Sequence, residues 1–90
     1  MTNANISVNR AGLILASFLG LFHLAWALLV ALGFAQAILD FIYRLHFLNN
    51  PFTIQTFELG TAALLVIVTA ACGYVLGAVL AWLWNLIHKR

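Results

Sequence analysis

Residues 59–87 read LGTAALLVIVTAACGYVLGAVLAWLWNLI and contain no acidic, basic or histidine side chain. Residues 11–34, AGLILASFLGLFHLAWALLVALGF, form a second apolar run in which His23 is the only ionisable side chain. A helix of about 20 apolar residues crosses about 30 Å of hydrocarbon, and both runs exceed that length. The sequence therefore predicts an all-α fold in which two transmembrane helices form a hairpin.

The composition excludes an ordinary soluble domain. Hydrophobic residues make up 66% of the 90 residues and charged residues only 7%, whereas soluble chains carry about 25% charged residues. The formal net charge of +2 comes mainly from Lys89 and Arg90, and so small and local a charge does not suggest nucleic-acid binding. We expect the partners to be the lipid bilayer and either copies of this chain or a larger membrane complex.

A signal peptide is an alternative interpretation of the N-terminal half. Arg10, the apolar run after it and the small residues Ala35 and Ala37 follow the order of such a peptide. The apolar region of a signal peptide is about 7–15 residues long, so the run over residues 11–34 is too long. We therefore interpret this run as a membrane span.

Residues 35–58, between the spans, are predicted to form an interfacial helix and a loop on the outer side of the membrane. Gln36, Asp40 and Arg44 are spaced by four and share one helical face, with the acid before the base as a favourable ion pair requires. A straight helix through the first span and this segment would be about 57 Å long. It must therefore bend, tilt or protrude, and Gly33 is the expected place of a bend.

The loop is expected to begin at Asn49-Asn50-Pro51, because proline lacks a backbone donor and disfavours helix in the residue before it. Thr56 is the expected N-cap of the second span. Glu58 would then lie in the first turn, where the helix dipole favours negative charge.

The two ends of the chain are short: residues 1–10 form a polar tail and residues 88–90 a basic end. Arg10 and the Lys89-Arg90 pair lie on the same side of the predicted hairpin, and only Arg44 lies on the other. Basic residues favour the cytoplasmic side of a membrane. We therefore expect both termini to be cytoplasmic.

Small residues line one face of each span at intervals of three, four or seven residues. In lipid, small residues allow helix backbones to approach closely enough for dispersion forces to hold them together. We interpret these faces as helix-packing surfaces rather than chance, and the pattern fits contacts within one chain or between copies. The packing residues are Ala16, Gly20, His23 and Ala27 in the first span, and Thr69, Gly73, Gly77 and Ala81 in the second.

His23 is the most suggestive polar residue, because ionisable groups inside a membrane normally face protein or water. Its ring is expected to hydrogen-bond across the helix interface, for instance to Thr69 or Tyr74. A proton or ion path is one alternative, and a haem or metal ligand, with Cys72 at a similar depth, is another. A metal site needs three or four ligands and one chain offers two here, so the packing role is favoured and no cofactor is predicted.

The polar residues of the outer segment are expected to gather at the loop. We interpret them as a solvated, ion-paired interface, and an ion- or partner-binding vestibule is the alternative. No catalytic arrangement accompanies them: the sequence has no carboxylate pair within a span, no phosphate-binding loop and no CxxC pair. The members of this outer polar cluster are Asp40, Arg44, His46 and Glu58.

Three elements resemble a family of small, uncharacterised prokaryotic two-span membrane proteins. They are the run HLAWALLVALG over residues 23–33, the pair Ala35-Gln36 with Leu39-Asp40-Phe41, and Leu45-His46-Phe47. The resemblance covers most of the chain, from the first span to Trp84. It implies two spans in a prokaryotic inner membrane and no known activity. It also implies a recurring pattern of His23, Trp26, Gln36, Asp40 and His46.

The sequence thus predicts a non-enzymatic structural or accessory membrane protein that self-associates or binds a larger membrane complex. A small channel or holin-like pore-former is an alternative, because two-span chains with basic C-termini resemble one class of holin. Neither span, however, has a strong polar face to line water. A cofactor-binding membrane subunit that uses His23 is a further alternative.

Overall fold

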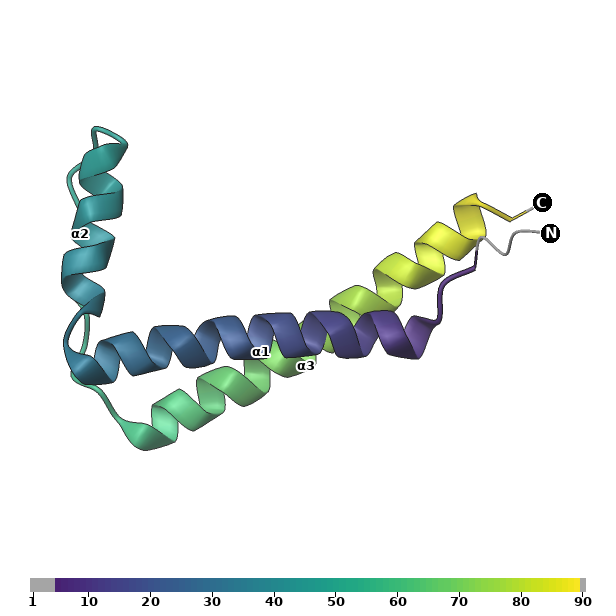
Figure 1. Ribbon diagram of the computed structural model, residues 1–90, viewed down its shortest axis with the longest axis horizontal. Helices are drawn as coiled ribbons and strands as arrows, with labels where there is room; N and C mark the ends of the chain where they lie inside the picture. Colours follow the sequence, from purple (N-terminus) through teal and green to yellow (C-terminus); the bar gives the residue numbers. More distant parts are fainter. Residues whose placement is uncertain (1–4, 90) are drawn as a thin grey trace.

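The computed structural model describes residues 5–89, which form three helices and no strand. Helices α1 (Val8–Leu32) and α3 (Leu59–Ile87) cross to form a hairpin, and α2 (Ala35–Leu45) lies between them in sequence. Figure 1 shows α2 pointing across the long axis of the hairpin at one end, while the segment before α1 and the end of α3 meet at the other end. The predicted all-α hairpin with an extra helix between its spans is confirmed.

Helix α1 begins at Val8, three residues before the predicted start of the span. Ser7 is its N-cap, and the Ser7 hydroxyl accepts a hydrogen bond from the Arg10 backbone N–H at 3.2 Å. This bond satisfies one of the free N–H groups of the first turn. Part of the predicted polar tail is therefore helical, and residues 1–4 of that tail lie outside the described residues.

Helix α1 ends in a glycine turn. Gly33 has φ 86°, a left-handed conformation that glycine adopts without steric cost. The Gly33 N–H donates to the Val30 carbonyl at 3.1 Å and the Phe34 N–H to the Leu29 carbonyl at 2.9 Å, which is a Schellman motif. The chain bends here, where the sequence placed the bend, and α2 starts two residues later at Ala35.

Helix α2 ends in the same motif without a glycine. Phe47 has φ 62°, and its N–H donates to the Arg44 carbonyl at 3.1 Å while the Leu48 N–H donates to the Tyr43 carbonyl at 2.9 Å. A left-handed conformation costs a non-glycine residue about 1–2 kcal/mol. The helix thus stops before Asn49-Asn50-Pro51, which belongs to the return loop.

Helix α3 begins at Leu59, and the expected capping by Thr56 does not occur. Glu58 occupies the N-cap position with an extended backbone, and its side chain makes no capping bond to the backbone. The Glu58 carboxylate accepts a hydrogen bond from the Thr61 hydroxyl at 2.6 Å instead. The first turn of α3 therefore has a side-chain bond between Glu58 and Thr61 and no side-chain cap.

Helices α1 and α3 are long and apolar enough to cross a membrane. At 1.5 Å per residue, the 25 residues of α1 and the 29 of α3 extend about 37 and about 43 Å. Only 11% of the most apolar stretch of each helix is buried. A core helix of a soluble domain would be mostly buried, whereas most residues of these two stretches are at least partly exposed.

Candidate functional site

The closest contact between α1 and α3 is made at glycines, where the backbones touch. A Cβ placed on Gly73 would lie 2.9 Å from the Leu15 carbonyl carbon and 3.1 Å from the Cα of Ala16. A Cβ on Gly77 would lie 2.9 Å from the Ala11 carbonyl carbon. These distances leave no room for a side chain, so the small-residue faces meet within one chain.

The same small-residue surface continues toward the far end of the hairpin, but there the helices are less close. A Cβ on Gly20 would lie 3.3 Å from the Cβ of Ala70, which is a side-chain rather than a backbone contact. Ala27, the predicted packing residue of α1 closest to that end, is buried, and so is Ala81 at the opposite end of the contact. Thr69 is half-buried, and its hydroxyl donates to the Leu65 carbonyl of its own helix at 2.7 Å.

Two polar contacts near the termini were not predicted. The Tyr74 ring lies against Gly12, and a Cβ there would be 2.8 Å from two ring carbons. The Tyr74 hydroxyl donates to the Asn9 side-chain oxygen at 2.7 Å. Gly12 therefore makes room for a ring that reaches from α3 to the first turn of α1.

The second contact joins the segment before α1 to the end of α3. The Ile6 N–H donates to the Asn85 side-chain oxygen at 2.6 Å, and the Asn85 amide donates to the Ile6 carbonyl at 2.8 Å. Both polar groups of one asparagine are thus used. One feature of the sequence could have indicated this contact. Asn85 is an amide side chain between Trp84 and Leu86 in an otherwise apolar run.

His23 does not make the predicted hydrogen bond across the interface. Its Nδ1 donates to the Leu19 carbonyl, one turn earlier in α1, at 2.7 Å. Its ring packs edge-on against Phe22, with ring centroids 5.4 Å apart. The two expected partners bond elsewhere, since Thr69 bonds within α3 and Tyr74 bonds Asn9.

No ligand set for a metal forms around His23. Within residues 5–89, no three side chains of histidine, cysteine, aspartate or glutamate are grouped closely enough to hold an ion. Cys72, the suggested second ligand, is exposed on the outside of the hairpin. Within one chain, the described residues therefore do not supply the three ligands of the metal site considered from the sequence.

In α2, Asp40 is bound by amides rather than by Arg44. The Asp40 carboxylate accepts hydrogen bonds from the Asn50 amide at 2.7 Å and the Gln36 amide at 3.0 Å. The Asn50 and Gln36 bonds, with a smaller contribution from the Arg44 charge, lower the pKa of Asp40 from its ordinary value of 3.8. The predicted Asp40–Arg44 ion pair is absent from the described residues, and Arg44 instead lies 5.9 Å from the ring centroid of Phe41.

Gln36 ties the return loop to α2. Its side-chain oxygen accepts a hydrogen bond from the Ile54 N–H at 2.7 Å, and its amide also donates to the Phe52 carbonyl at 3.2 Å. Tyr43 extends the contact, because its ring lies 6.1 Å from that of Phe52. The loop therefore runs back along one side of α2.

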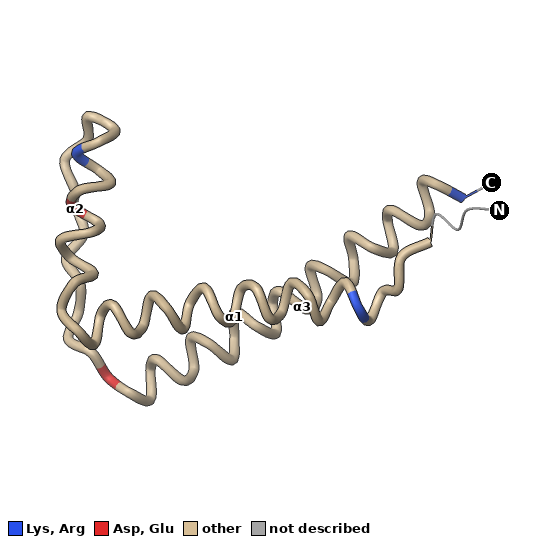
Figure 2. Tube along the Cα trace, viewed as in Figure 1, with Lys and Arg blue, Asp and Glu red and all other residues tan. Residues whose placement is uncertain are grey.

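Of the four residues predicted as one outer polar cluster, Asp40, Arg44 and His46 belong to α2 and its C-cap, and Glu58 lies at the start of α3. Figure 2 shows the two acidic residues at different points, one on α2 and one just before α3. The first is Asp40 and the second is Glu58, which pairs with Thr61. His46, at the end of α2, donates to the Ile42 carbonyl at 2.7 Å. Asp40, His46 and Glu58 thus make local hydrogen bonds, and of the four residues Glu58 lies apart from α2.

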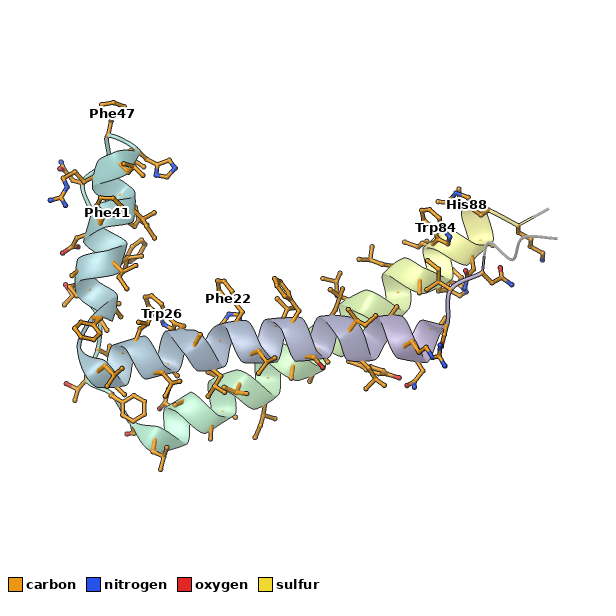
Figure 3. All side chains as sticks on the ribbon, viewed as in Figure 1. Phe22, Trp26, Phe41, Phe47, Trp84 and His88 are labelled. Carbon is orange, nitrogen blue, oxygen red and sulfur yellow. The ribbon has the colours of Figure 1, made fainter. Side chains whose placement is uncertain are left out.

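The basic residues and aromatic rings mark the end of the hairpin that carries the termini. In Figure 2, basic residues lie near the start of α1 and at the end of the chain, and these are Arg10 and Lys89. Figure 3 shows Trp84 and His88 together at the same end, where their rings stack with centroids 3.9 Å apart. Such a grouping is typical of the membrane–water interface.

Comparison of the chain with protein-family models, with curated proteins and with solved structures found no match. The resemblance to small prokaryotic two-span proteins therefore stays a prediction from the sequence.

Proposed function

We propose that this chain is an integral membrane protein that inserts as a helical hairpin with both termini in the cytoplasm. In this proposal it acts as a non-enzymatic structural or accessory subunit, in a homo-oligomer or in a larger complex of a prokaryotic inner membrane. The observation that carries the proposal is the division of side chains between the two sides of α1 and α3. Glycine and alanine fill the contact inside the hairpin, and large apolar residues cover its outside.

This division supports insertion because bare apolar surface on this scale needs lipid or protein around it. Leu21 on α1 and Ile67 on α3 are each 65% exposed. The same division of side chains supports an accessory role, because the close backbone contacts at Gly73 and Gly77 join α1 to α3 of the same chain. A partner subunit would therefore meet a stable, preformed hairpin.

The pore-forming alternative receives less support from the geometry. A water-filled path needs unpaired polar groups along a span, whereas His23 and Thr69 both donate to carbonyls of their own helices. Tyr74 and Asn85 bond the N-terminal segment. These four side chains therefore make hydrogen bonds within the chain.

Purification in mild detergent tests the proposal. We expect a C-terminally tagged chain to stay in the membrane fraction after alkaline carbonate washing and to elute with a protein mass above that of the 9.9 kDa monomer. The Gly77→Leu variant should lose the assembly because it disrupts the preformed hairpin, whereas Val75→Leu should keep it. Release by carbonate would contradict membrane insertion, and a monomer without other subunits would contradict the accessory role.

The cofactor alternative has its own test. Purified wild-type protein should show no Soret absorption and no stoichiometric metal. A chromophore or metal that is present in the wild type and lost in both His23→Leu and His23→Asn would favour the cofactor alternative over the packing role.

A further inference from the structure

We propose that the apolar face of α2 lies on the lipid of one leaflet, at the boundary between headgroups and hydrocarbon, as an in-plane anchor of the hairpin. The inference rests on the proposed insertion of α1 and α3, and it names the surface that the helix between them contacts.

The depth of α2 follows from the length of α1. Helix α1 extends about 37 Å, which exceeds the hydrocarbon thickness of about 30 Å by only a few ångströms. Because α2 begins at Ala35 directly after the glycine turn, it starts where the span reaches the headgroups. Figure 1 shows that α2 then runs across the hairpin axis, and therefore along the membrane surface.

Helix α2 has one polar and one apolar face. Gln36, Asp40 and Tyr43 contact the return loop, and Arg44 lies beside them on the helix. The opposite face is exposed and has no partner within the described residues, and Phe47, 98% exposed, extends it at the tip. The residues of the apolar face are Ile38, Phe41, Ile42 and Leu45.

The polar face is directed away from the spans. In Figure 2 the blue segment of α2, which marks its basic residue, lies on the side of the helix turned away from the α1–α3 hairpin. The opposite, apolar face is therefore directed toward the hairpin and hence toward the bilayer. An amphipathic helix in this position is stabilised by burying its apolar face at the boundary of headgroups and acyl chains.

The loop keeps α2 in this orientation. The hydrogen bonds from Asn50 to Asp40 and from Ile54 to Gln36 join the helix to a loop that returns to the start of α3. A rotation of α2 about its axis would break these bonds, so the apolar face keeps its direction.

Lipid, rather than a protein subunit, is the occupant that fits the surrounding surface. Figure 3 shows Phe22 and Trp26 of α1 pointing to the side toward which α2 extends. The apolar face of α2 is thus continuous with the apolar exterior of α1 around the bend. Tryptophan at this level is typical of the membrane interface, and acyl chains of one leaflet can fill the angle between the helices.

Fluorescence quenching of a bimane label in vesicles of phosphatidylcholine and phosphatidylglycerol tests the inference. The labelled variants are Ile42→Cys on the apolar face and Arg44→Cys on the polar face, both with Cys72→Ala. The wild-type protein labelled at Cys72, its only cysteine and exposed on α3, reports on the span. We expect nitroxide lipids labelled high on the acyl chain to quench Ile42→Cys, which aqueous iodide should not reach, and the reverse for Arg44→Cys.

The outcomes separate the two proposals. Iodide quenching of Ile42→Cys as strong as that of Arg44→Cys would overturn the lipid contact, and so would shielding from both quenchers, which would indicate a covering protein. Lipid quenching at Cys72 in those cases would leave membrane insertion intact. Iodide quenching at Cys72 would contradict the insertion itself, and the inference with it.

Discussion

Around Gly73 and Gly77, α1 and α3 touch backbone to backbone, whereas around Gln36 and Asp40 the helix α2 and its loop are joined by side-chain hydrogen bonds. The first region depends on missing side chains, so any added atom separates the helices. The second depends mostly on exposed polar atoms, where water competes for the bonds. We expect changes in the first region to alter the whole hairpin and changes in the second to remain local.

The largest effect is expected for Gly77→Leu. A Cβ at this position would lie 3.0 Å from the Cα of Gly12, so a leucine must separate the backbones, at a cost of about 1–3 kcal/mol or more. Unfolding in mixed detergent micelles would measure the loss. Val75→Leu is the matched control, because Val75 is 61% exposed on the same helix; equal stability of the two variants would contradict the packing role.

A smaller effect is expected for Asn85→Leu. The change removes two hydrogen bonds to Ile6, which together are worth about 1–2 kcal/mol. Faster hydrogen exchange of the Ile6 amide should accompany it, with the α1–α3 contact at the glycines intact. Asn49→Leu, in the exposed return loop, serves as the control and should leave exchange at Ile6 unchanged.

Gln36→Leu should act on the second region alone. It removes the acceptor of the Ile54 N–H and the donor to the Phe52 carbonyl, and a loss of about 1.4 kcal/mol corresponds to tenfold faster exchange. We expect that increase at the Ile54 amide and little change in unfolding of the hairpin. Gln55→Leu is the neighbouring control; a global loss of stability in Gln36→Leu would remove the distinction between the two regions.

The smallest effect is expected from titration of Asp40. Hydrogen bonds from Asn50 and Gln36 lower its pKa in the folded chain below the ordinary value of 3.8. The carboxylate therefore stabilises the α2–loop contact fully above that value, and the contribution is lost as the pH falls through the lowered pKa. NMR signals of the Asn50 side-chain amide should titrate with a midpoint below 3.8, and a midpoint above it would contradict the bond.

The two long apolar helices and the bend could be predicted because they depend on local composition. Length and apolarity predict a helix that could cross a membrane, and Gly33 supplies the left-handed residue that ends α1. The spacing of Gly73 and Gly77 likewise predicted a packing face, since four residues return to the same side of a helix. Each of these features can be predicted from neighbouring residues, without knowing which distant residue it contacts.

The polar contacts could not be predicted because their partners lie far apart in sequence or compete with nearer ones. Asn85 bonds Ile6 from the opposite end of the chain, and no spacing rule links them. For Asp40, the sequence favoured Arg44 one turn away, but Asn50 returns on the loop and supplies a closer neutral donor. His23 and Thr69 each donate to a carbonyl of their own helix, so the expected bond between them does not form.

Cysteine accessibility in sealed, inside-out and right-side-out vesicles tests the central claim most directly. The variants are Asn49→Cys in the return loop and Lys89→Cys beside the C-terminus, each with Cys72→Ala. If the hairpin spans the membrane with both termini in the cytoplasm, an impermeant maleimide labels Asn49→Cys only in right-side-out vesicles and Lys89→Cys only in inside-out vesicles. Labelling of both positions from the same side would contradict the account.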